Sequence, residues 1–139
     1  MEPEQPEKGA RRFEELWVWQ QARELVKEIY EDLRAGPGSK DFGFRDQIQR
    51  AGISVMNNIA EGFERFTEIE FARFLDVARG SCGEVRSMYY AAEDWVTSTP
   101  MSPTQDVRRH GRFPPARVPG FSSAEVKVFK RERVKEFRK

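Results

Sequence analysis

Four glutamates lie close together near the middle of the chain, and carboxylates at such short spacing are the first candidates for chemistry. Glu61, Glu64, Glu68 and Glu70 could act as an acid–base pair or supply oxygens to a metal ion. A hard cation needs several oxygens that converge from defined loop positions, and this run lacks that pattern. We therefore favour solvated capping charges, and we expect no metal and no cofactor.

Histidine and cysteine, the other common catalytic and ligand types, occur once each. His110 stands among prolines and arginines, which argues against a Ser/His/Asp triad and against the Glu-x-x-His pairs of di-iron bundles. Cys82 cannot form a disulfide or a thiolate zinc cluster within one chain, and helical periodicity places it on a buried face. The sequence thus predicts no catalytic residue and a protein that is not an enzyme.

Four other polar residues allow two interpretations. Asn58 and Glu61 lie near the end of a predicted helix, and Ser81 and Glu84 lie inside the next one. They could bond the helix end and the turn at Gly62, or they could contact a ligand or another subunit. We favour the structural role for the first two and leave both roles open for the second two.

Apolar residues at steps of three and four define the elements that would position these side chains. They predict helices over about 13–35, 44–61 and 67–96. The first helix would bury Leu16, Trp19, Ala22, Val26, Ile29 and Leu33, and the second Ile48, Ala51, Val55 and Ile59. We expect residues 1–12, which are rich in Glu and Pro, to be mobile.

Small and capping residues refine the ends and crossings of these helices. Thr67 and Glu70 have the spacing of a capping box at the start of the third helix. Gly62 is placed to supply the left-handed residue that ends the second helix. Gly80 and Gly83 each cost about 1 kcal/mol inside a helix, which indicates a tight crossing at that point.

Charge divides the chain into two opposed parts. Residues 1–99 carry 13 Lys/Arg and 19 Asp/Glu, a net of −6, whereas residues 100–139 carry 11 and 4, a net of +7. Prolines and arginines make residues 97–121 a basic linker, and Ser122 and Glu125 predict the start of a short basic helix over about 122–138. The linker and the C-terminal segment 122–139 together could contact phosphates or pair with the acidic body. The candidate phosphate contacts are Arg108, Arg109, Arg112, Lys127, Lys130, Arg131, Arg133 and Lys135.

Three blocks of residues resemble one protein family. They are Phe13-x-x-Leu16-x-Val18-Trp19 in the first helix, Gln47-Ile48-x-Arg50-Ala51 leading to Asn58-Ile59-Ala60-Glu61-Gly62, and Glu70-Phe71 leading to Gly80-Ser81-x-x-Glu84. This order of blocks is similar to the four-helix-bundle proteins named for intervening sequences in bacterial 23S ribosomal RNA genes. It is also similar to the accessory proteins of diversity-generating retroelements, which act beside a reverse transcriptase.

The resemblance implies an all-α, antiparallel up-down four-helix bundle that assembles into a homopentamer, has no enzymatic activity and has a suspected role in RNA binding. Asn58, Glu61, Gly62, Gly80, Ser81 and Glu84 would be structural or subunit-contact residues of the family motif. The chain departs from the family after Trp95, where a fourth long helix is expected. The terminus could dock as a short fourth helix, remain a mobile tail, leave a groove for another subunit, or represent an altered reading of the terminus.

Two functional hypotheses follow from these observations. The protein is an oligomeric RNA-binding accessory, or it is a structural or protein-interaction bundle, including an accessory subunit of a reverse transcriptase without RNA contact. No run of 18 apolar residues occurs and the N-terminus lacks a signal-peptide pattern, so we expect a cytoplasmic protein with no membrane contact.

Overall fold

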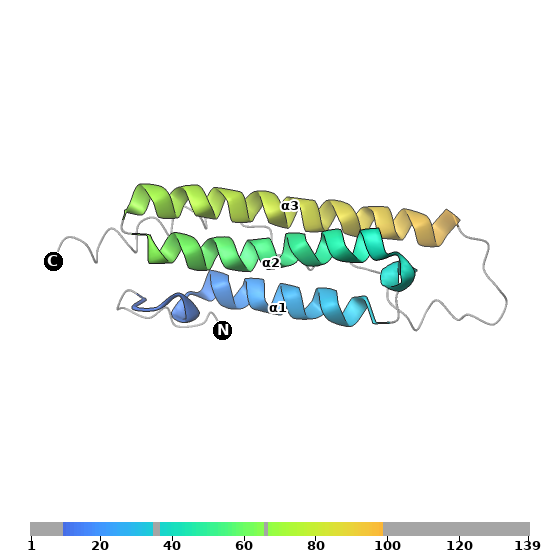
Figure 1. Cartoon of the computed structure of the whole chain (residues 1–139), viewed down its shortest axis with the longest axis horizontal. Coiled ribbons are helices and arrows are strands. Elements are labelled where there is room, and N and C mark those ends of the chain that lie inside the picture. Colours follow the sequence, from blue (N-terminus) through green and yellow to red (C-terminus); the bar gives the residue numbers. More distant parts are fainter. Residues whose placement is uncertain (1–9, 35–36, 66, 99–139) are drawn as a thin grey trace, which may run out of the picture.

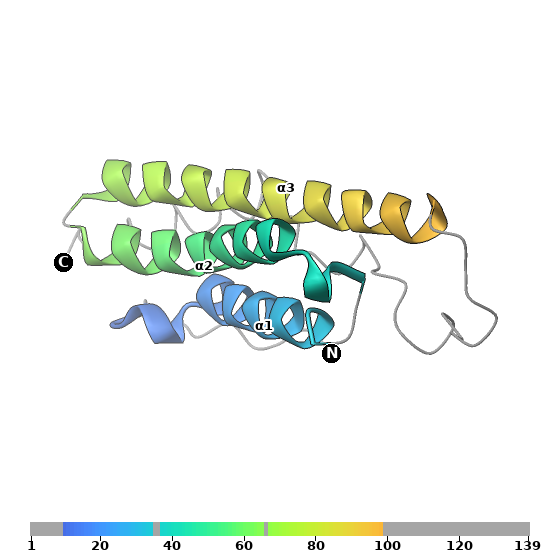
Figure 2. The same cartoon turned by 45° about the vertical axis from the view of Figure 1, so that its right-hand side comes forward.

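Three antiparallel helices make up the part of the chain that the structure describes. The computed structural model describes residues 10–34, 37–65 and 67–98. The helices are α1 (Trp17–Asp32), α2 (Phe42–Glu64) and α3 (Glu68–Ser98), and two short 3-10 helices, η1 (Phe13–Glu15) and η2 (Pro37–Lys40), precede α1 and α2. α2 lies between α1 and α3 and packs against both (Figures 1 and 2). The all-α class is confirmed, whereas the fourth helix expected over 122–138 lies outside the described residues.

The first helix is shorter than the periodicity predicted. Leu16 has an extended backbone, with φ −69° and ψ 123°, so it separates the η1 turn from α1. The ring of Phe13 meets Trp19 edge-on at 5.2 Å between centroids, which holds η1 against the bundle without continuing the helix. The expected start at residue 13 was therefore wrong by one turn.

The second helix is longer than predicted at both ends. It begins at Phe42 because the Asp41 carboxylate accepts a hydrogen bond from the Phe44 N–H at 3.0 Å, and this bond caps the helix start. It continues through Gly62 to Glu64, and Arg65 is the first extended residue. The prediction that Gly62 ends the helix was wrong, because this glycine lies inside it.

The start of the third helix agrees with the predicted capping box in its main feature. The Thr67 hydroxyl accepts a hydrogen bond from the Glu70 N–H at 3.2 Å, and it donates one to the Glu70 carboxylate at 3.1 Å. α3 then runs to Ser98, two residues beyond the predicted end. None of the described helices is both long and apolar enough to cross a membrane.

One apolar core joins the inward sides of the three helices. In α1 the centre of the buried face lies at Val18 and Leu25, whereas Leu16 and Val26, which were expected to be buried, are half-buried. The predicted face of α2 is confirmed. Among the described residues, the buried apolar set is Val18, Trp19, Ala22, Leu25, Ile29, Leu33, Ile48, Ala51, Val55, Ile59, Phe71, Leu75, Ala78, Cys82, Val85, Tyr89 and Ala92.

Candidate interaction surface on the second and third helices

A line of polar contacts joins α2 to α3 beside the core. The hydroxyls of Ser54 and Ser81 lie 2.9 Å apart and share a hydrogen bond. The Asn58 amide nitrogen donates to the Ser54 carbonyl at 2.7 Å and to its hydroxyl at 3.0 Å. All three side chains are half-buried, so their hydrogen-bonding groups are satisfied where water has limited access. Asn58 thus bonds the preceding turn of its own helix rather than the turn at Gly62, and Ser81 belongs to the same group of contacts.

A second polar contact between these helices lies closer to the start of α2. The Gln47 side-chain amide donates a hydrogen bond to the Glu84 carboxylate, and both residues are exposed. From Gln47 to Ser54 the residue numbers rise along α2, whereas their partners, Glu84 and Ser81, fall along α3. The two bonds therefore agree with an antiparallel arrangement and help to fix the register of the two helices. The carboxylate of Glu84 is thus used as an acceptor between helices.

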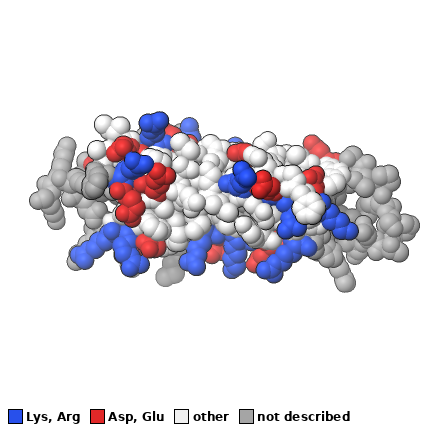
Figure 3. All heavy atoms as spheres, viewed as in Figure 1, with Lys and Arg blue, Asp and Glu red and all other residues white. Residues whose placement is uncertain are grey.

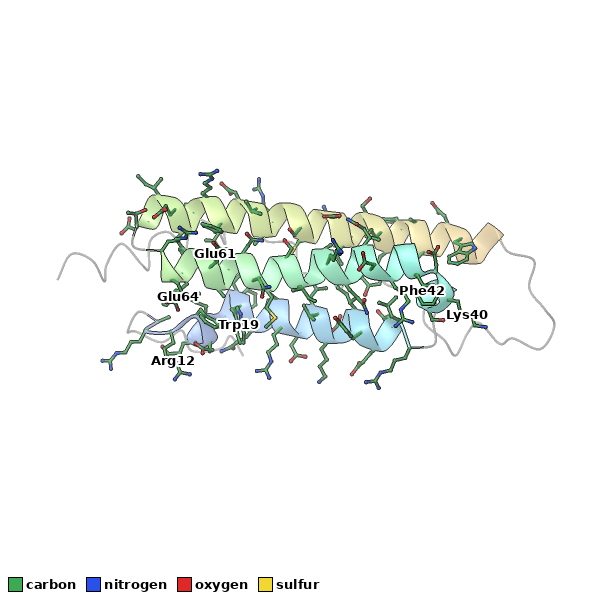
Figure 4. The ribbon with its side chains drawn as sticks, in the orientation of Figure 1. Arg12, Trp19, Lys40, Phe42, Glu61 and Glu64 are labelled. Carbon is green, nitrogen blue, oxygen red and sulfur yellow. The ribbon has the colours of Figure 1, made fainter. Side chains whose placement is uncertain are left out.

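Two of the four glutamates that suggested a metal site have other partners, Arg65 for Glu61 and Thr67 for Glu70. Arg65 donates to the Glu61 carboxylate at 2.7 Å, and its guanidinium lies over the Phe74 ring at 5.3 Å from the centroid. This hydrogen bond raises the pKa of Arg65. Figure 4 shows Glu61 and Glu64 at the same end of α2. Within the described residues, no three His, Cys, Asp or Glu side chains are placed to hold a metal ion.

Of the five glycines in α2 and α3, Gly43 meets only an ordinary contact at 3.5 Å, and the other four fall into two kinds. A Cβ at Gly62 would lie 2.5 Å from the Phe74 Cβ, and one at Gly52 would lie 2.5 Å from the Ile29 Cδ1. A Cβ at Gly80 or Gly83 would meet no described atom within 4 Å. The tight crossing expected at Gly80 and Gly83 is therefore wrong for the described part of the chain, and the close approaches lie at the glycines of α2.

The side of α2 that faces away from the core has an ordered charge pattern. We call this side the α2 outer face, and its exposed residues are Asp46, Arg50, Ile53, Asn57, Glu61 and Glu64. Asp46 pairs with Arg50 at 3.0 Å, Glu61 pairs with Arg65 at 2.7 Å, and no charged residue occurs between Arg50 and Glu61. Figure 3 shows an uncharged area over the middle of α2 with charged groups on either side. Ile53, 36% exposed, belongs to the uncharged stretch between Arg50 and Glu61.

Cys82 and Tyr89 lie on the buried side of α3. Burial raises the pKa of the Cys82 thiol to about 12, and the thiolate that a nucleophile needs is accordingly scarce at neutral pH. The Tyr89 hydroxyl donates to the Asp32 carboxylate at 2.9 Å and so connects α3 to α1. Burial, and then the nearby Asp32 charge, raise the pKa of Tyr89. Both residues serve packing in this arrangement.

The comparison with known families agrees with the motif-bearing helices. The model of the family described as 23S rRNA-intervening sequence protein matches residues 14–101, which is more than half of the chain. The chain belongs to this family. The match covers all three helices and both polar contacts between α2 and α3, and it ends before most of the basic segment. No curated protein matches the chain.

In this member of the 23S rRNA-intervening sequence protein family, several predicted site residues lie beyond the described part of the chain. The eight candidate phosphate contacts between Arg108 and Lys135 lie outside the described residues, and so does His110. The predicted linker over 97–121 falls outside them after Ser98. Of the six family-motif residues, Ser81 and Glu84 form hydrogen bonds to the facing helix. Asn58 donates to Ser54 of its own helix.

Sequence reasoning missed half of the polar line in this family member. Gln47 and Ser54 were seen only as letters of the motif blocks, yet each supplies one side of a bond to α3. The spacing of Gln47, Ser54 and Asn58 by seven and four residues could have shown a polar edge along α2. The partner residues on α3 depend on the register of the two helices, which spacing within one helix does not contain.

Proposed function

We propose that this protein is a non-enzymatic, oligomeric accessory protein of the cytoplasm that binds RNA through its basic C-terminal segment. The observation that carries the proposal is the separation of charge. The 16 acidic and 12 basic residues of the described part, a net of −4, give it no excess of positive charge for phosphates, whereas residues 100–139 carry +7.

Charge-neutralising substitutions test this proposal. Replacing Arg108, Arg109 and Arg112 with glutamine should weaken RNA binding and lower the slope of log affinity against log salt by up to about 2 to 3, because phosphate contacts release counterions. Filter binding of a single-stranded RNA between 50 and 200 mM salt measures both quantities.

A matched control removes the same charge from the bundle. Arg34, Arg73 and Arg86 are exposed on the described helices and turn, and their replacement with glutamine should leave the salt slope unchanged. Equal weakening by both triple substitutions would contradict a role for the C-terminal segment. Absence of RNA binding at 50 mM salt would remove the RNA proposal altogether.

Assembly is the second part of the proposal. By its family resemblance the protein would form a homo-oligomer, with a pentamer as the expected number. Deleting residues 100–139 should abolish RNA retention while the oligomer stays intact, as measured by sedimentation equilibrium. Loss of the oligomer on deletion would favour the competing function, in which the basic segment only joins subunits.

A fourth helix over 122–138 completes the proposed bundle. α2 packs against both α1 and α3, so the remaining place for a fourth helix is along α1 and α3 on the side away from α2. If Phe129 packs there, Phe129→Ala should lower the free energy of unfolding by about 3 kcal/mol. An unchanged urea midpoint would contradict a docked fourth helix.

A structural or protein-interaction bundle is the second candidate function, and the α2 outer face favours it. An uncharged centre with charged residues at its rim is the usual arrangement of a protein–protein contact. An accessory subunit of a reverse transcriptase without RNA contact would also use such a surface. Retention of RNA that persists after purification to homogeneity would count against this candidate.

A further inference from the structure

Exposed aromatic residues gather at one end of the bundle. In the part of the chain that the structure describes, five aromatic residues are more than 40% exposed. Four of them lie where α1 and α3 end and α2 begins, on the right in Figure 1. A single exposed ring needs no explanation, but a concentration of rings indicates a surface that binds a partner. The four are Tyr30, Phe42, Tyr90 and Trp95, and the fifth, Trp17, begins α1 at the opposite end.

Phe42 and Trp95 border the junction of η2 and α2, and we call them the aromatic pair. Phe42 is the first residue of α2 and is 81% exposed. Trp95, 43% exposed, follows Glu84 by three helical turns, so it lies on the side of α3 that Glu84 turns toward α2. α3 also packs against η2, which ends two residues before Phe42. Tyr90 lies about 140° from Trp95 around α3 and is not part of the pair.

Positive side chains flank the Phe42 ring. Lys40 is exposed and lies beside Phe42 at this end of the bundle (Figure 4). Arg45 is half-buried and donates a hydrogen bond to the Ser39 carbonyl at 2.8 Å, a neutral partner that leaves its charge uncompensated. Figure 3 shows Lys and Arg groups gathered near the start of α2. An anionic group next to Phe42 would therefore meet positive charge.

The carboxylates nearest to Phe42 in sequence already have partners. Asp41 accepts the Phe44 N–H, and Asp46 pairs with Arg50 at 3.0 Å. Those nearest to Trp95 point elsewhere, because Glu93 and Asp94 lie about 160° and 100° from it around α3. The exposed faces of the two rings are accordingly not screened by an adjacent unpaired carboxylate.

The place of the aromatic pair along the chain indicates its partner. α3 ends at Ser98, three residues after Trp95, and the chain then enters the segment of net charge +7. Arg108 is ten residues beyond Ser98, a span of at most about 35 Å. A polyanion held by that segment is thus within reach of the pair. The described part of the chain, with a net charge of −4, suits the uncharged portion of such a polyanion.

We infer that Phe42 and Trp95 stack on unpaired bases of a single-stranded RNA whose phosphates are held by the basic C-terminal segment. Every base has an apolar face, so such stacking tolerates any sequence. Bases within a duplex stack on one another and offer no free face, so the pair selects single strands. The inference rests on the RNA binding of the proposed function and adds a base-binding site on the described helices. It places no condition on the number of subunits.

Removing each ring in the full chain tests the inference. Phe42→Ala and Trp95→Ala should each weaken binding of a single-stranded oligoadenylate roughly fivefold to a hundredfold. The slope of log affinity against log salt, measured between about 50 and 200 mM, should stay at the wild-type value, because stacking releases no counterions. Trp17→Ala is the matched control, since Trp17 has the same 43% exposure at the opposite end, and it should bind as the wild type does.

An oligonucleotide without bases separates stacking from a structural defect. An abasic strand of the same length keeps the phosphates and lacks the bases, so the wild type should bind it more weakly than the oligoadenylate. Phe42→Ala and Trp95→Ala should bind the abasic strand as well as the wild type does. Equal losses on both strands would overturn the inference, because the rings would then act through the fold and not through bases.

Conservative replacement gives a second readout. Trp95→Phe keeps a ring and should retain most of the affinity that Trp95→Ala loses. Quenching of tryptophan fluorescence on addition of oligoadenylate should disappear in Trp95→Phe and persist in Trp17→Phe. Quenching that persists without Trp95 would contradict a base on that ring.

The outcomes also separate this inference from the proposed function. If both alanine variants keep wild-type affinity while the Arg108, Arg109 and Arg112 substitutions lower the salt slope, the inference fails and the proposed function stands. Wild-type RNA affinity with an altered mass in sedimentation equilibrium would assign the aromatic pair to a contact between chains and overturn the inference. A wild-type protein that binds no RNA at 50 mM salt would remove both.

Discussion

The glycines of α2 and those of α3 have the same residue type and opposite surroundings. Gly52 and Gly62 are buried where another helix lies too close for a side chain, whereas Gly80 and Gly83 border open space within the described structure. The first pair is required by contacts already present in one chain. The second pair lowers helix stability, and no contact with the described residues requires a glycine at either position. Small residues in a helix therefore indicate close packing only when the register of the neighbouring helix is known.

The largest expected effect is on the alkylation rate of Cys82. This residue lies between Gly80 and Gly83 in sequence, but its side chain is on the buried side of α3. Raising the thiol pKa from 9.0 to about 12 lowers the thiolate fraction at pH 8 by about a thousandfold. Alkylation by iodoacetamide should accordingly be about a thousandfold slower in the folded protein than in urea. Mass spectrometry of timed samples measures the two rates, and similar rates would place Cys82 on the open side of α3.

The same shift makes a pH prediction with a definite sign. The pKa of the thiol is about 9 in the unfolded chain and about 12 in the folded one. Between these values the unfolded chain loses the thiol proton while the folded chain keeps it. The free energy of unfolding is therefore unaffected below pH 9 and falls as the pH rises toward 12. Urea midpoints of the wild type should fall across this range. Cys82→Ala should fall less steeply, with the remaining slope due to Tyr89, whose pKa is also raised.

Gly62→Ala should be the most destabilising of the glycine substitutions. Its Cβ would lie 2.5 Å from the Phe74 Cβ, which is fixed to the backbone of α3, so the helices must separate. Overpacking of this kind costs about 3 kcal/mol. Gly43→Ala is a matched control, because a Cβ there meets its nearest atom at 3.5 Å, and it should leave the urea midpoint unchanged or raise it.

Gly52→Ala should cost less, about 1 kcal/mol, because the obstructing atom is the flexible end of Ile29. The prediction can be sharpened by removing that atom. In Ile29→Val the Cδ1 is absent, so the double variant should be more stable than the sum of the two single effects predicts. Strict additivity would show that Ile29 is not the obstacle.

Gly83→Ala should have the smallest effect and the opposite sign. With no described atom within 4 Å of the added methyl group, the gain in helix propensity, about 0.5–1 kcal/mol, should appear as increased stability. Thermal denaturation at low protein concentration measures it. A loss of stability would reveal a contact to a part of the chain outside the described residues.

The sequence was sufficient for features that depend on neighbours within one helix. Periodicity identified the buried face of α2 through Ile48 and Val55, and the Thr67–Glu70 spacing marked the start of α3. It also placed Cys82 on the buried side. These features are set by the 3.6-residue repeat and by local hydrogen bonds, and both are visible in the order of residues.

Features that depend on a second helix were missed or inverted. One local feature was also missed, because the Asp41 carboxylate caps α2 and starts it at Phe42, two residues before the predicted start. Gly62 after a helical run suggested a terminus, whereas the approach of Phe74 explains it. The bond from Ser54 to Ser81 depends on the relative position of α2 and α3. Register between helices is a tertiary quantity that no single helix encodes.

The unequal lengths of the helices have a mechanical consequence. α3 has 31 residues and α2 has 23, about 46 Å and 34 Å long, and the chain leaves α3 at Ser98. A partner that holds the chain beyond Ser98 pulls along the axis of α3. The polar bonds to α2 are then loaded together in shear rather than opened one after another. Under tension at this end, the polar bonds between α2 and α3 should therefore break together as the helices slide past each other, and not one after another.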